Sequence, residues 1–397
     1  MGPDELANGL AELSVQHRRR KRMVMQVAQG ALAECEGQPC LNFAANDYLG
    51  LAGHPVLVDA CIAGARRWGV GSGASALVSG YYDAHCQAER ELAAFVGRDA
   101  ALLFTSGYAA NQSVLGSLLG RGDAVFGDRL NHASLNDGCL LSRATFRRFR
   151  HNDLDHLASL LEATPARTRL IAVDAVYSMD GDEAPLADLL GLARRYDAWL
   201  YVDDAHGFGL LGEGHGSACA SGLADDRLIY MATLGKAAGV SGAFVAGGGE
   251  LIEWLVNTAR DYIYTTAAPP MLAEAVRASL RLIAGESWRR DRVFAHVRRL
   301  GAALAVGEFE HPPSRMPIQP LIIGNSEQTS SLSERLRAQG IWVPAIRPPT
   351  VAEGRARLRI SLSAAHDDDM VSRLIAALGD GGHGTAGDRD DVGPGSG

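Results

Sequence analysis

The chain has 397 residues, 47% of them hydrophobic, and a formal net charge of -8. This size and apolar content are enough for a large core and for more than one domain. The negative charge argues against a nucleic-acid-binding protein. No segment resembles a membrane span or a secretory signal, so we expect a cytoplasmic protein that does not enter the membrane.

The predicted elements divide the chain into four parts. Residues 1–45 are expected to form an N-terminal helix and arm, 46–285 a large domain, 286–379 a smaller domain, and 380–397 a disordered, glycine-rich tail. A helix over 271–285 leads into the smaller domain, where helices and strands are expected to alternate. The helices are predicted at 289–304, 329–339 and 367–378, and the strands at 318–323, 341–346 and 357–362.

Three apolar, β-branched runs in the large domain predict buried strands, at 170–178, 199–203 and 228–233. The stretch 186–196 between the first two has a helical pattern, and 212–226 has the length of a crossover connection. This alternation predicts an α/β architecture with a parallel sheet.

A phosphate site is predicted where a further strand, 101–104, turns into a helix. Gly107 and Tyr108 fall in the first turn of that helix, where unpaired N–H groups and the helix dipole favour an anion. Thr233 could add a hydroxyl donor from the other side. An ordinary strand-to-helix turn has the same pattern, so the segment alone leaves both interpretations open.

Lys236 is the only charged residue between Arg227 and Glu250, in an apolar and glycine-rich stretch. A buried ammonium costs several kcal/mol unless it is paired, so a buried lysine loses its proton readily. The neutral amine can then form a Schiff base. The alternative is a lysine whose stem is buried and whose ammonium reaches solvent.

Polar residues follow the same strands and are expected to converge with Lys236, because ligands of open α/β sheets bind at the carboxyl ends of the strands. They are Ser178, Asp203, His206 and Thr233. A Schiff-base lysine opposite a buried carboxylate is what pyridoxal 5'-phosphate (PLP) requires, with Asp203 on the ring nitrogen and with Ser178 and His206 on the phenolic oxygen. Alternatively, Asp203 could cap the end of a strand, and His206 could lie in a surface loop.

Seven ordered segments resemble the α-oxoamine synthases, a family of fold-type-I PLP-dependent transferases, and the resemblance covers nearly the whole chain. It implies an α/β fold with a mostly parallel seven-stranded sheet in the large domain, a smaller C-terminal α+β domain, and a homodimer. The segments are 42–51, 71–75, 104–111, 178–182, 202–207, 233–236 and 357–366.

Four more segments are most similar to one branch of that family, which acts in biotin synthesis. This similarity implies condensation of L-alanine with a pimeloyl thioester, carried on coenzyme A or acyl carrier protein, with release of carbon dioxide and the carrier thiol. Sister activities remain open, namely those of aminolevulinate synthase, aminoketobutyrate ligase and serine palmitoyltransferase, as does a non-catalytic binding subunit. The segments are 128–135, 151–156, 318–324 and 345–351.

The resemblance also implies roles for individual residues. Lys236 would bind PLP and then act as the general base, His132 would stack on the cofactor ring, and His206 would donate to the developing oxyanion. With Asp203, these residues form the predicted catalytic set. Substrate contacts are assigned to Arg22, Asn46, Thr350 and Arg359, with Arg359 on the alanine carboxylate and Arg22 on the distal carboxylate of the acyl chain.

Some of these assignments have structural alternatives. Arg357 and Arg359 alternate along one strand, so the pattern alone makes both look solvated. The basic run 17–22, which contains Arg22, could be a solvated helix face or could attract coenzyme A phosphates or an acidic carrier protein. Thr265 and Thr266 match a segment that, in such dimers, reaches the phosphate of the neighbouring subunit.

A few positions depart from the family pattern. Asp174 stands where glutamate is usual, Ala237 where glycine is common and Ala267 where serine is frequent, so the role of Asp174 is in doubt. A glycine-rich segment at 71–76 mimics a dinucleotide-binding motif but follows a helical segment, 56–68, which disfavours a dehydrogenase. No metal site is expected, and the six cysteines are predicted to be reduced because none has Cys-x-x-Cys spacing.

Overall fold

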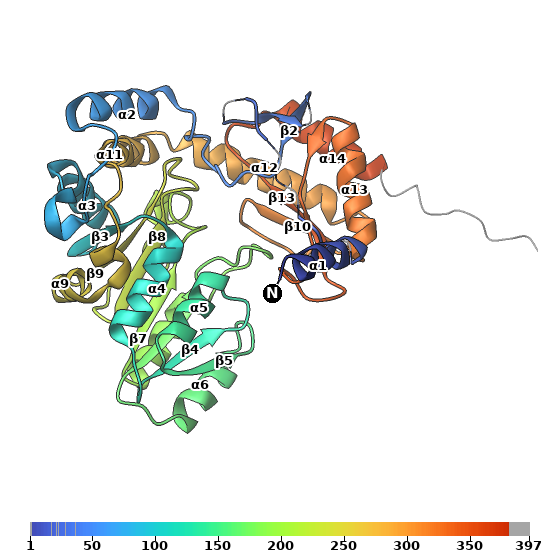
Figure 1. Ribbon diagram of the computed structural model, residues 1–397. Helices are drawn as coiled ribbons and strands as arrows, with labels where there is room; N and C mark the ends of the chain where they lie inside the picture. The colour runs from blue at the N-terminus through green and yellow to red at the C-terminus, as the bar shows by residue number, and fades with distance from the viewer. Residues whose placement is uncertain are drawn as a thin grey trace, which may run out of the picture.

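The structure is a computed structural model that describes residues 2–380 except 17, 21, 23, 28 and 36 (Figure 1). The expected disordered tail, 380–397, therefore lies outside the described residues apart from residue 380, where the last helix ends. Two residues of the basic run, His17 and Lys21, also lie outside them.

The centre of the larger part is a seven-stranded sheet with the order β3-β9-β8-β7-β6-β4-β5. Only β9 runs antiparallel to its neighbours, so the predicted, mostly parallel sheet is confirmed. The three strands predicted from their apolar runs are β6, β7 and β8, but β6 ends at Asp174 and not at Ser178 as predicted. The strands are β3 (Ala100–Phe104), β4 (Ala124–Asp128), β5 (Thr145–Phe149), β6 (Arg169–Asp174), β7 (Ala198–Asp203), β8 (Leu228–Thr233) and β9 (Ala243–Gly247).

The sheet is apolar on both faces because helices cover both of them. Alternate residues of β6 belong to two different core clusters: Ile171 and Val173 pack on one face, and Leu170 and Ala172 on the other. The second face is covered by α4 (Gly107–Leu118), α5 (Ala133–Leu141) and α9 (Gly249–Thr258). Against the first face lie α3 (Asp83–Phe95), α6 (Leu154–Ala163), α7 (Leu186–Arg195) and α11 (Pro270–Gly285).

Shorter elements complete this part of the molecule. The helix α2 (Pro55–Trp68) packs along α11, as Figure 1 shows. The region predicted as a crossover between β7 and β8 contains only a 3₁₀ turn, η2 (Gly212–Gly214), and one helical turn, α8 (Ser217–Ala220). The remaining elements are a π-helical turn, η1 (Ala76–Gly80), and α10 (Arg260–Tyr264).

The C-terminal part has its own core, built on the antiparallel sheet β10-β13-β12. The long helix α12 leads into it from the side of α11 (Figure 1). Its elements are α12 (Trp288–Leu304), β10 (Ile318–Gly324), α13 (Ser326–Ala338), β11 (Ile341–Trp342), β12 (Ala345–Ile346), β13 (Ala356–Ser361) and α14 (Asp368–Asp380).

The single strand predicted over 341–346 is wrong. Two residues, Ile341 and Trp342, form β11 and pair with β2, whereas Ala345 and Ile346 form β12 and pair with β13. Pro344 lies between the two strands, has no N–H for a ladder, and interrupts the pairing. Its carbonyl still accepts a hydrogen bond from the Arg359 N–H at 3.2 Å, which joins this bend to β13.

The N-terminal arm contributes strands to this C-terminal part. After α1 (Pro3–Val15), the hairpin β1 (Leu32–Cys35) and β2 (Gln38–Asn42) forms a sheet with β11, in which β2 and β11 run parallel. Leu41 and Phe43 are buried in the same core cluster as the last helices. The arm thus packs with residues some 300 positions further along the chain. No local sequence pattern predicts this association.

Two general expectations can be compared with the described residues. Within residues 2–380, apart from the five gaps named above, no helix is both long and apolar enough to cross a membrane. Four cysteines, at 61, 86, 139 and 219, are free thiols, as predicted. Cys40 is disulfide-bonded, so the prediction of reduced cysteines is wrong for that residue, which lies on β2 of the hairpin.

Candidate active site

The carboxyl ends of neighbouring parallel strands meet at one edge of the sheet and border a cavity of about 200 Å³. All eight residues predicted to bind the cofactor line this cavity. They are Gly107, Tyr108, His132, Ser178, Asp203, His206, Thr233 and Lys236, and they are joined by Asn111, Ser134 and Asp174.

Lys236 is held in a tight turn that follows β8. Gly239 has a φ of +68°, and a Cβ there would lie 2.6 Å from the backbone nitrogen of Ala52, so only glycine lets this turn pack against the 51–52 backbone. The Nζ atom lies 2.8 Å from Nε2 of His206. Burial lowers the pKa of Lys236 to about 8, although the nearby Asp203 carboxylate acts in the opposite direction. At pH 7 roughly a tenth of this amine is therefore neutral and nucleophilic, far more than for a lysine of ordinary pKa.

His206 is buried, with 5% of its surface exposed. Its Nδ1 atom lies 2.7 Å from the hydroxyl of Tyr48, and no carboxylate contacts the ring among the described residues. Burial holds the pKa of His206 well below its usual value, and the positive charges of Lys236 and Arg359 act in the same direction. His206 is therefore a neutral imidazole, able to donate from one nitrogen and accept at the other.

The carboxylate of Asp203 is fixed from two sides. Its Oδ1 accepts a hydrogen bond from the Ala205 N–H at 3.0 Å, and its Oδ2 accepts one from Nδ2 of Asn111 at 2.8 Å. Asn111 is fully buried, and its Oδ1 accepts from the hydroxyl of Tyr201 at 2.7 Å. Asn111 is thus a positioning residue that the sequence reasoning did not identify, although an amide inside the apolar face of a helix is a usable signal.

His132 lies at the start of α5 with its ring open to the cavity. Its backbone N–H donates to Oδ2 of Asp174 at 2.9 Å, and its Nδ1 lies 2.7 Å from the hydroxyl of Ser134. Burial, and then the charge of Asp203, hold the pKa of Asp174 well above its usual value. The doubtful Asp174 therefore has a definite contact: it fixes the backbone of His132. Its Oδ1 is buried without a hydrogen-bond partner.

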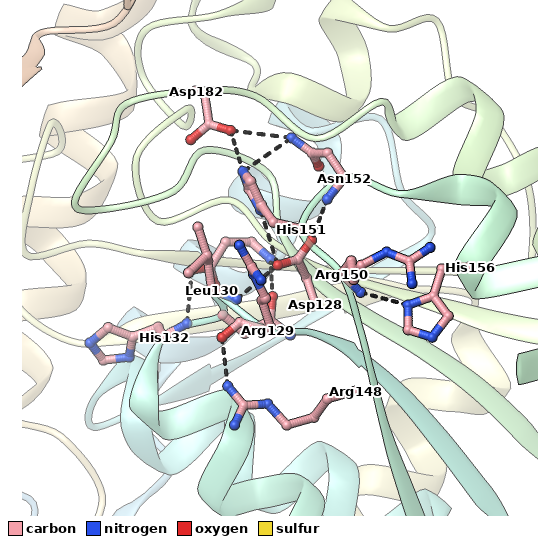
Figure 2. A network of polar contacts seen from close by, with 12 residues as sticks. Asp128, Arg129, Leu130, His132, Arg148, Arg150, His151, Asn152, His156 and Asp182 are labelled. Carbon is pink, nitrogen blue, oxygen red and sulfur yellow. Dashed lines mark hydrogen bonds and ion pairs between the residues drawn. The ribbon is translucent and has the colours of Figure 1, made fainter. Parts of the chain in front are cut away.

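A second polar network supports the loop that carries His132 (Figure 2). His151 lies between two carboxylates, with Nδ1 3.0 Å from Oδ1 of Asp128 and Nε2 2.6 Å from Oδ2 of Asp182. Asp128 also accepts from the Leu130 N–H at 2.8 Å. The network therefore joins the loop after β4 to the loop that follows Ser178.

The structure separates the two arginines that the strand pattern left equivalent. Both are buried, but Arg357 forms an ion pair with Asp180, with its Nη1 2.5 Å from Oδ1. Arg359 has no carboxylate partner among the described residues. It donates through Nε to the Ser178 carbonyl at 2.6 Å and through Nη1 to Oδ1 of Asn46 at 3.0 Å. Its Nη2 makes no hydrogen bond within the described part of the chain, which leaves a cationic donor for a bound carboxylate.

At the predicted phosphate site, Gly107 and Tyr108 occupy the first turn of α4, where N–H groups lack intrahelical acceptors. Ser106 caps this helix by accepting from the Ala109 N–H at 3.1 Å. The hydroxyl of Thr233 faces the cavity but donates to the Gly242 carbonyl at 3.0 Å. The first turn of α4 is thus open to an anion at the end of the cavity formed by β8.

None of the four predicted substrate residues, Arg22, Asn46, Thr350 and Arg359, is among the residues that line this cavity. Arg22 lines a separate cleft along α13. Thr350 accepts a hydrogen bond on its Oγ1 from Nη2 of Arg20 at 2.9 Å, so Arg20, two residues earlier, is the arginine that reaches it. Thr265 and Thr266 line a third cavity. Sequence reasoning could name the basic run but not which of its residues contact the 350 loop, where Arg20 binds Thr350 and Arg18 pairs with Glu353.

The donor set of the main cavity fits PLP. An amine with a lowered pKa, a fixed carboxylate, a neutral histidine and an open helix N-terminus correspond to the aldehyde, ring nitrogen, phenolic oxygen and phosphate of that cofactor. No group of His, Cys, Asp and Glu side chains suited to a metal ion occurs within the described ranges. The arrangement can therefore bind an aldehyde cofactor and move a proton beside it.

Comparisons with known proteins agree with this geometry. The sequence model of the family described as "Aminotransferase class I and II" matches residues 38–378. A protein named 8-amino-7-oxononanoate synthase, from Chromobacterium violaceum, is 62% identical over 371 residues, which are 94% of this chain and 97% of that protein.

Solved structures share the fold. A variant of the serine palmitoyltransferase of S. paucimobilis, with a bound PLP–myriocin aldimine, matches with a TM-score of 0.90 and 27% identity, over 96% of this chain and 97% of its own. The 8-amino-7-oxononanoate synthase of Francisella tularensis matches with a TM-score of 0.75 and 29% identity, over 86% of this chain and 97% of its own. The fold is thus shared by enzymes with different names. Among those names, the 62% sequence identity favours 8-amino-7-oxononanoate synthase.

Proposed function

Because the chain belongs to the class I and II aminotransferase family and, within it, to the 8-amino-7-oxononanoate synthases, we propose that it condenses L-alanine with a pimeloyl thioester. It is a PLP-dependent acyltransferase of biotin biosynthesis, and the products are 8-amino-7-oxononanoate, carbon dioxide and the free carrier thiol. The observation that carries this proposal is the contact between the amine of Lys236 and the neutral ring of His206, beside the fixed carboxylate of Asp203.

The residues around the cavity bind and orient the cofactor. Lys236 would hold it through its amine, Asp203 would keep a proton on its ring nitrogen, and His132 would stack on its ring. Ser178 and His206 would hydrogen-bond its phenolic oxygen, and the first turn of α4 would bind its phosphate. The Thr233 hydroxyl would donate to that phosphate only after turning away from the Gly242 carbonyl. PLP, when bound, supplies an electron sink for the negative charge that develops at the α-carbon of alanine.

The same residues move the proton of the reaction. With PLP bound, the amine of Lys236 would remove the α-proton of alanine, because its lowered pKa lets it accept a proton near neutral pH. Arg359 would bind the alanine carboxylate through its guanidinium, which Asn46 fixes in place. His206 donates to the oxyanion that forms when the thioester carbonyl is attacked.

The acyl chain is assigned to the surface where the N-terminal arm meets the 350 loop. The hydrogen bond between Arg20 and Thr350 places a cation there, and Arg22 lines the neighbouring cleft. We assign the distal carboxylate of the pimeloyl group to this arginine pair. The carrier is coenzyme A or acyl carrier protein, and assays with both thioesters decide between them.

The composition of the chain gives a direct test of the covalent assignment. It contains two lysines, Lys21 and Lys236, among its 38 Lys and Arg residues. Borohydride reduction in the presence of PLP, followed by peptide mapping, should place the label on Lys236, and Lys21 serves as the internal control. Label confined to Lys21, or no label at all, contradicts the proposal and would favour a non-catalytic subunit.

A substrate panel tests the reaction itself. Thiol release from pimeloyl-CoA should be fastest with alanine and much slower with glycine or serine. A preference for glycine with acetyl-CoA or succinyl-CoA, or for serine with palmitoyl-CoA, would instead assign the chain to one of the sister synthases. Product mass distinguishes a true condensation from simple thioester hydrolysis.

The active enzyme is proposed to be a cytoplasmic homodimer. Thr265 and Thr266 line a cavity with Tyr81 and His85, and the matching segment in related dimers reaches the neighbour's phosphate. Sedimentation equilibrium should give twice the chain mass of 42.0 kDa. A monomer with full activity would remove the assignment of these two threonines.

A further inference from the structure

Tyr48 is fully buried and lies behind the active-site histidine. Its hydroxyl is 2.7 Å from Nδ1 of His206 and 3.2 Å from Oδ1 of Asn46. On the other side of the ring, Nε2 of His206 is 2.8 Å from Nζ of Lys236. The phenol therefore touches neither Lys236 nor the cavity, but it is one hydrogen bond away from the reacting amine.

The segment that carries Tyr48 is held in place from several directions. The carboxylate of Asp47 accepts from the Leu51 N–H at 2.9 Å, and the Tyr48 carbonyl accepts from the Ala364 N–H at 2.8 Å. The Ser363 hydroxyl donates to the Asp47 carbonyl at 2.6 Å. A hydroxyl on such a fixed backbone can impose a direction on the groups that it contacts.

The hydroxyl has one proton and two neighbours that can accept it. Oδ1 of Asn46 already accepts from Nη1 of Arg359 at 3.0 Å, whereas Nδ1 of His206 has no other partner among the described residues. The contact with Nδ1 is also the shorter of the two, at 2.7 Å against 3.2 Å. Both facts favour donation from Tyr48 to Nδ1.

A neutral imidazole carries a single N–H, so an Nδ1 that accepts leaves the proton on Nε2. We propose that Tyr48 is a positioning residue that fixes His206 in the Nε2–H tautomer, so that this N–H donates toward Lys236 and keeps its amine an acceptor. In the cofactor-loaded enzyme the same N–H points toward the phenolic oxygen. That last consequence rests on the proposed function, but the tautomer itself does not.

The opposite arrangement is chemically possible and makes different predictions. If Tyr48 donated to Asn46, its oxygen would accept from Nδ1–H, and Nε2 would accept a proton from Lys236. The lysine would then be stabilised as an ammonium, not as an amine. The two arrangements differ in which ring nitrogen is protonated, and that is directly measurable.

The test begins with the unmodified full-length chain without cofactor. With ¹⁵N-labelled histidine at about pH 9, above the Lys236 pKa of about 8, and with His206→Gln to assign the signals, the Nδ1 shift of His206 should be that of an unprotonated nitrogen and the Nε2 shift that of a protonated one. The reverse pattern overturns the proposal without any variant at position 48. The addition of PLP should leave the pattern unchanged.

The second measurement uses Tyr48→Phe, which keeps the ring and removes the donor. Acetylation of Lys236 is followed against pH by mass spectrometry, with Lys21 as the reference in the same molecule. We expect the midpoint for Lys236 to rise by roughly one pH unit, so that labelling near neutral pH slows up to about tenfold while that of Lys21 does not change.

The matched control is Tyr196→Phe, a half-buried tyrosine at the end of α7 whose ring stacks on Arg195. It should leave both the tautomer and the labelling midpoint unchanged. If Tyr48→Phe behaves in the same way, Tyr48 is a packing residue and the inference fails. Because none of these measurements uses alanine or a thioester, failure in the substrate panel would remove the proposed function and leave this result standing.

Discussion

His206 and His151 both lie near the carboxyl edge of the sheet, and their surroundings hold them in opposite charge states. His206 contacts a phenol and an amine, and burial beside two cations holds its pKa well below the usual value. His151 is also partly buried, which acts against its charge. The hydrogen bonds to Asp128 and Asp182 outweigh that effect and raise the pKa of His151 to about 9.

At this edge of the sheet, the hydrogen-bond partners of a histidine, more than its depth of burial, therefore determine its charge state and its role. A charged His151 between two carboxylates is a clamp, because it joins the loop after β4 to the loop at Asp182 (Figure 2). A neutral His206 beside Lys236 can transfer or direct a proton. The clamp carries the loop that positions His132, and so it supports the chemistry without taking part in it.

The largest effect on activity is expected when a permanently charged side chain replaces Lys236 beside the neutral His206. Lys236→Arg keeps a cation of similar length, but a guanidinium cannot lose its proton or bind an aldehyde in this way. We expect kcat for alanine condensation to fall by at least about 10³-fold, within the range attributed to a general base. Steady-state thiol release measures the loss.

The control for that variant is Lys236→Met, which removes the charge and keeps the stem. Both variants should lose activity and the cofactor's covalent link, while circular dichroism shows that each is folded. Activity of Lys236→Arg within tenfold of the parent would mean that this lysine only extends its ammonium to solvent, and the contrast between the two regions would disappear.

The next largest effect distinguishes Arg359, which has no carboxylate partner among the described residues, from Arg357, which pairs with Asp180. Arg359→Gln should lower kcat/KM for alanine by roughly 100-fold, since it removes the charged donor offered to the substrate carboxylate. Arg357→Gln breaks the ion pair with Asp180 and should instead lower stability, with a smaller change in kcat/KM. Equal losses in alanine binding for the two variants would contradict the assignment of Arg359.

Much of the fold followed from local patterns in the sequence. The apolar runs identified β6, β7 and β8, and the rule that parallel strands end at one edge brought Asp203, Thr233 and Lys236 to one cavity. The helix N-terminus at Gly107 was visible as a strand-to-helix turn. These predictions succeeded because each depends on residues close together in the chain or on a general property of parallel sheets.

The parts that failed or were missed depend on contacts between distant segments. The strand over 341–346 divides because its halves pair with β2 and β13, from opposite ends of the chain. Tyr48 meets His206 across 158 positions, and Asn111 meets Asp203 across 92. No local periodicity carries such pairings, and the isolated sequence could not show that Arg20, not Arg22, contacts Thr350.

The smallest expected effect is on the free energy of unfolding, which the charged His151 raises at low pH. The pKa of His151 is raised from 6.5 to about 9, so its contribution is fully present below about pH 6.5 and is lost as the pH rises through about 9. His151→Gln should therefore lower the free energy of unfolding by up to about 3 kcal/mol near pH 6, and by much less above pH 9. Urea unfolding at several pH values measures this difference. His156→Gln is the control, because the Nδ1 of His156 accepts from the Arg150 N–H at 3.0 Å and its ring forms no ion pair in the described part of the chain. The contact of His156 with the Asp153 carboxylate is made by its backbone N–H, which the substitution keeps. A deficit for His151→Gln that stays constant from pH 6 to pH 10 would mean that His151 is neutral, and its contrast with His206 would then lie in packing alone.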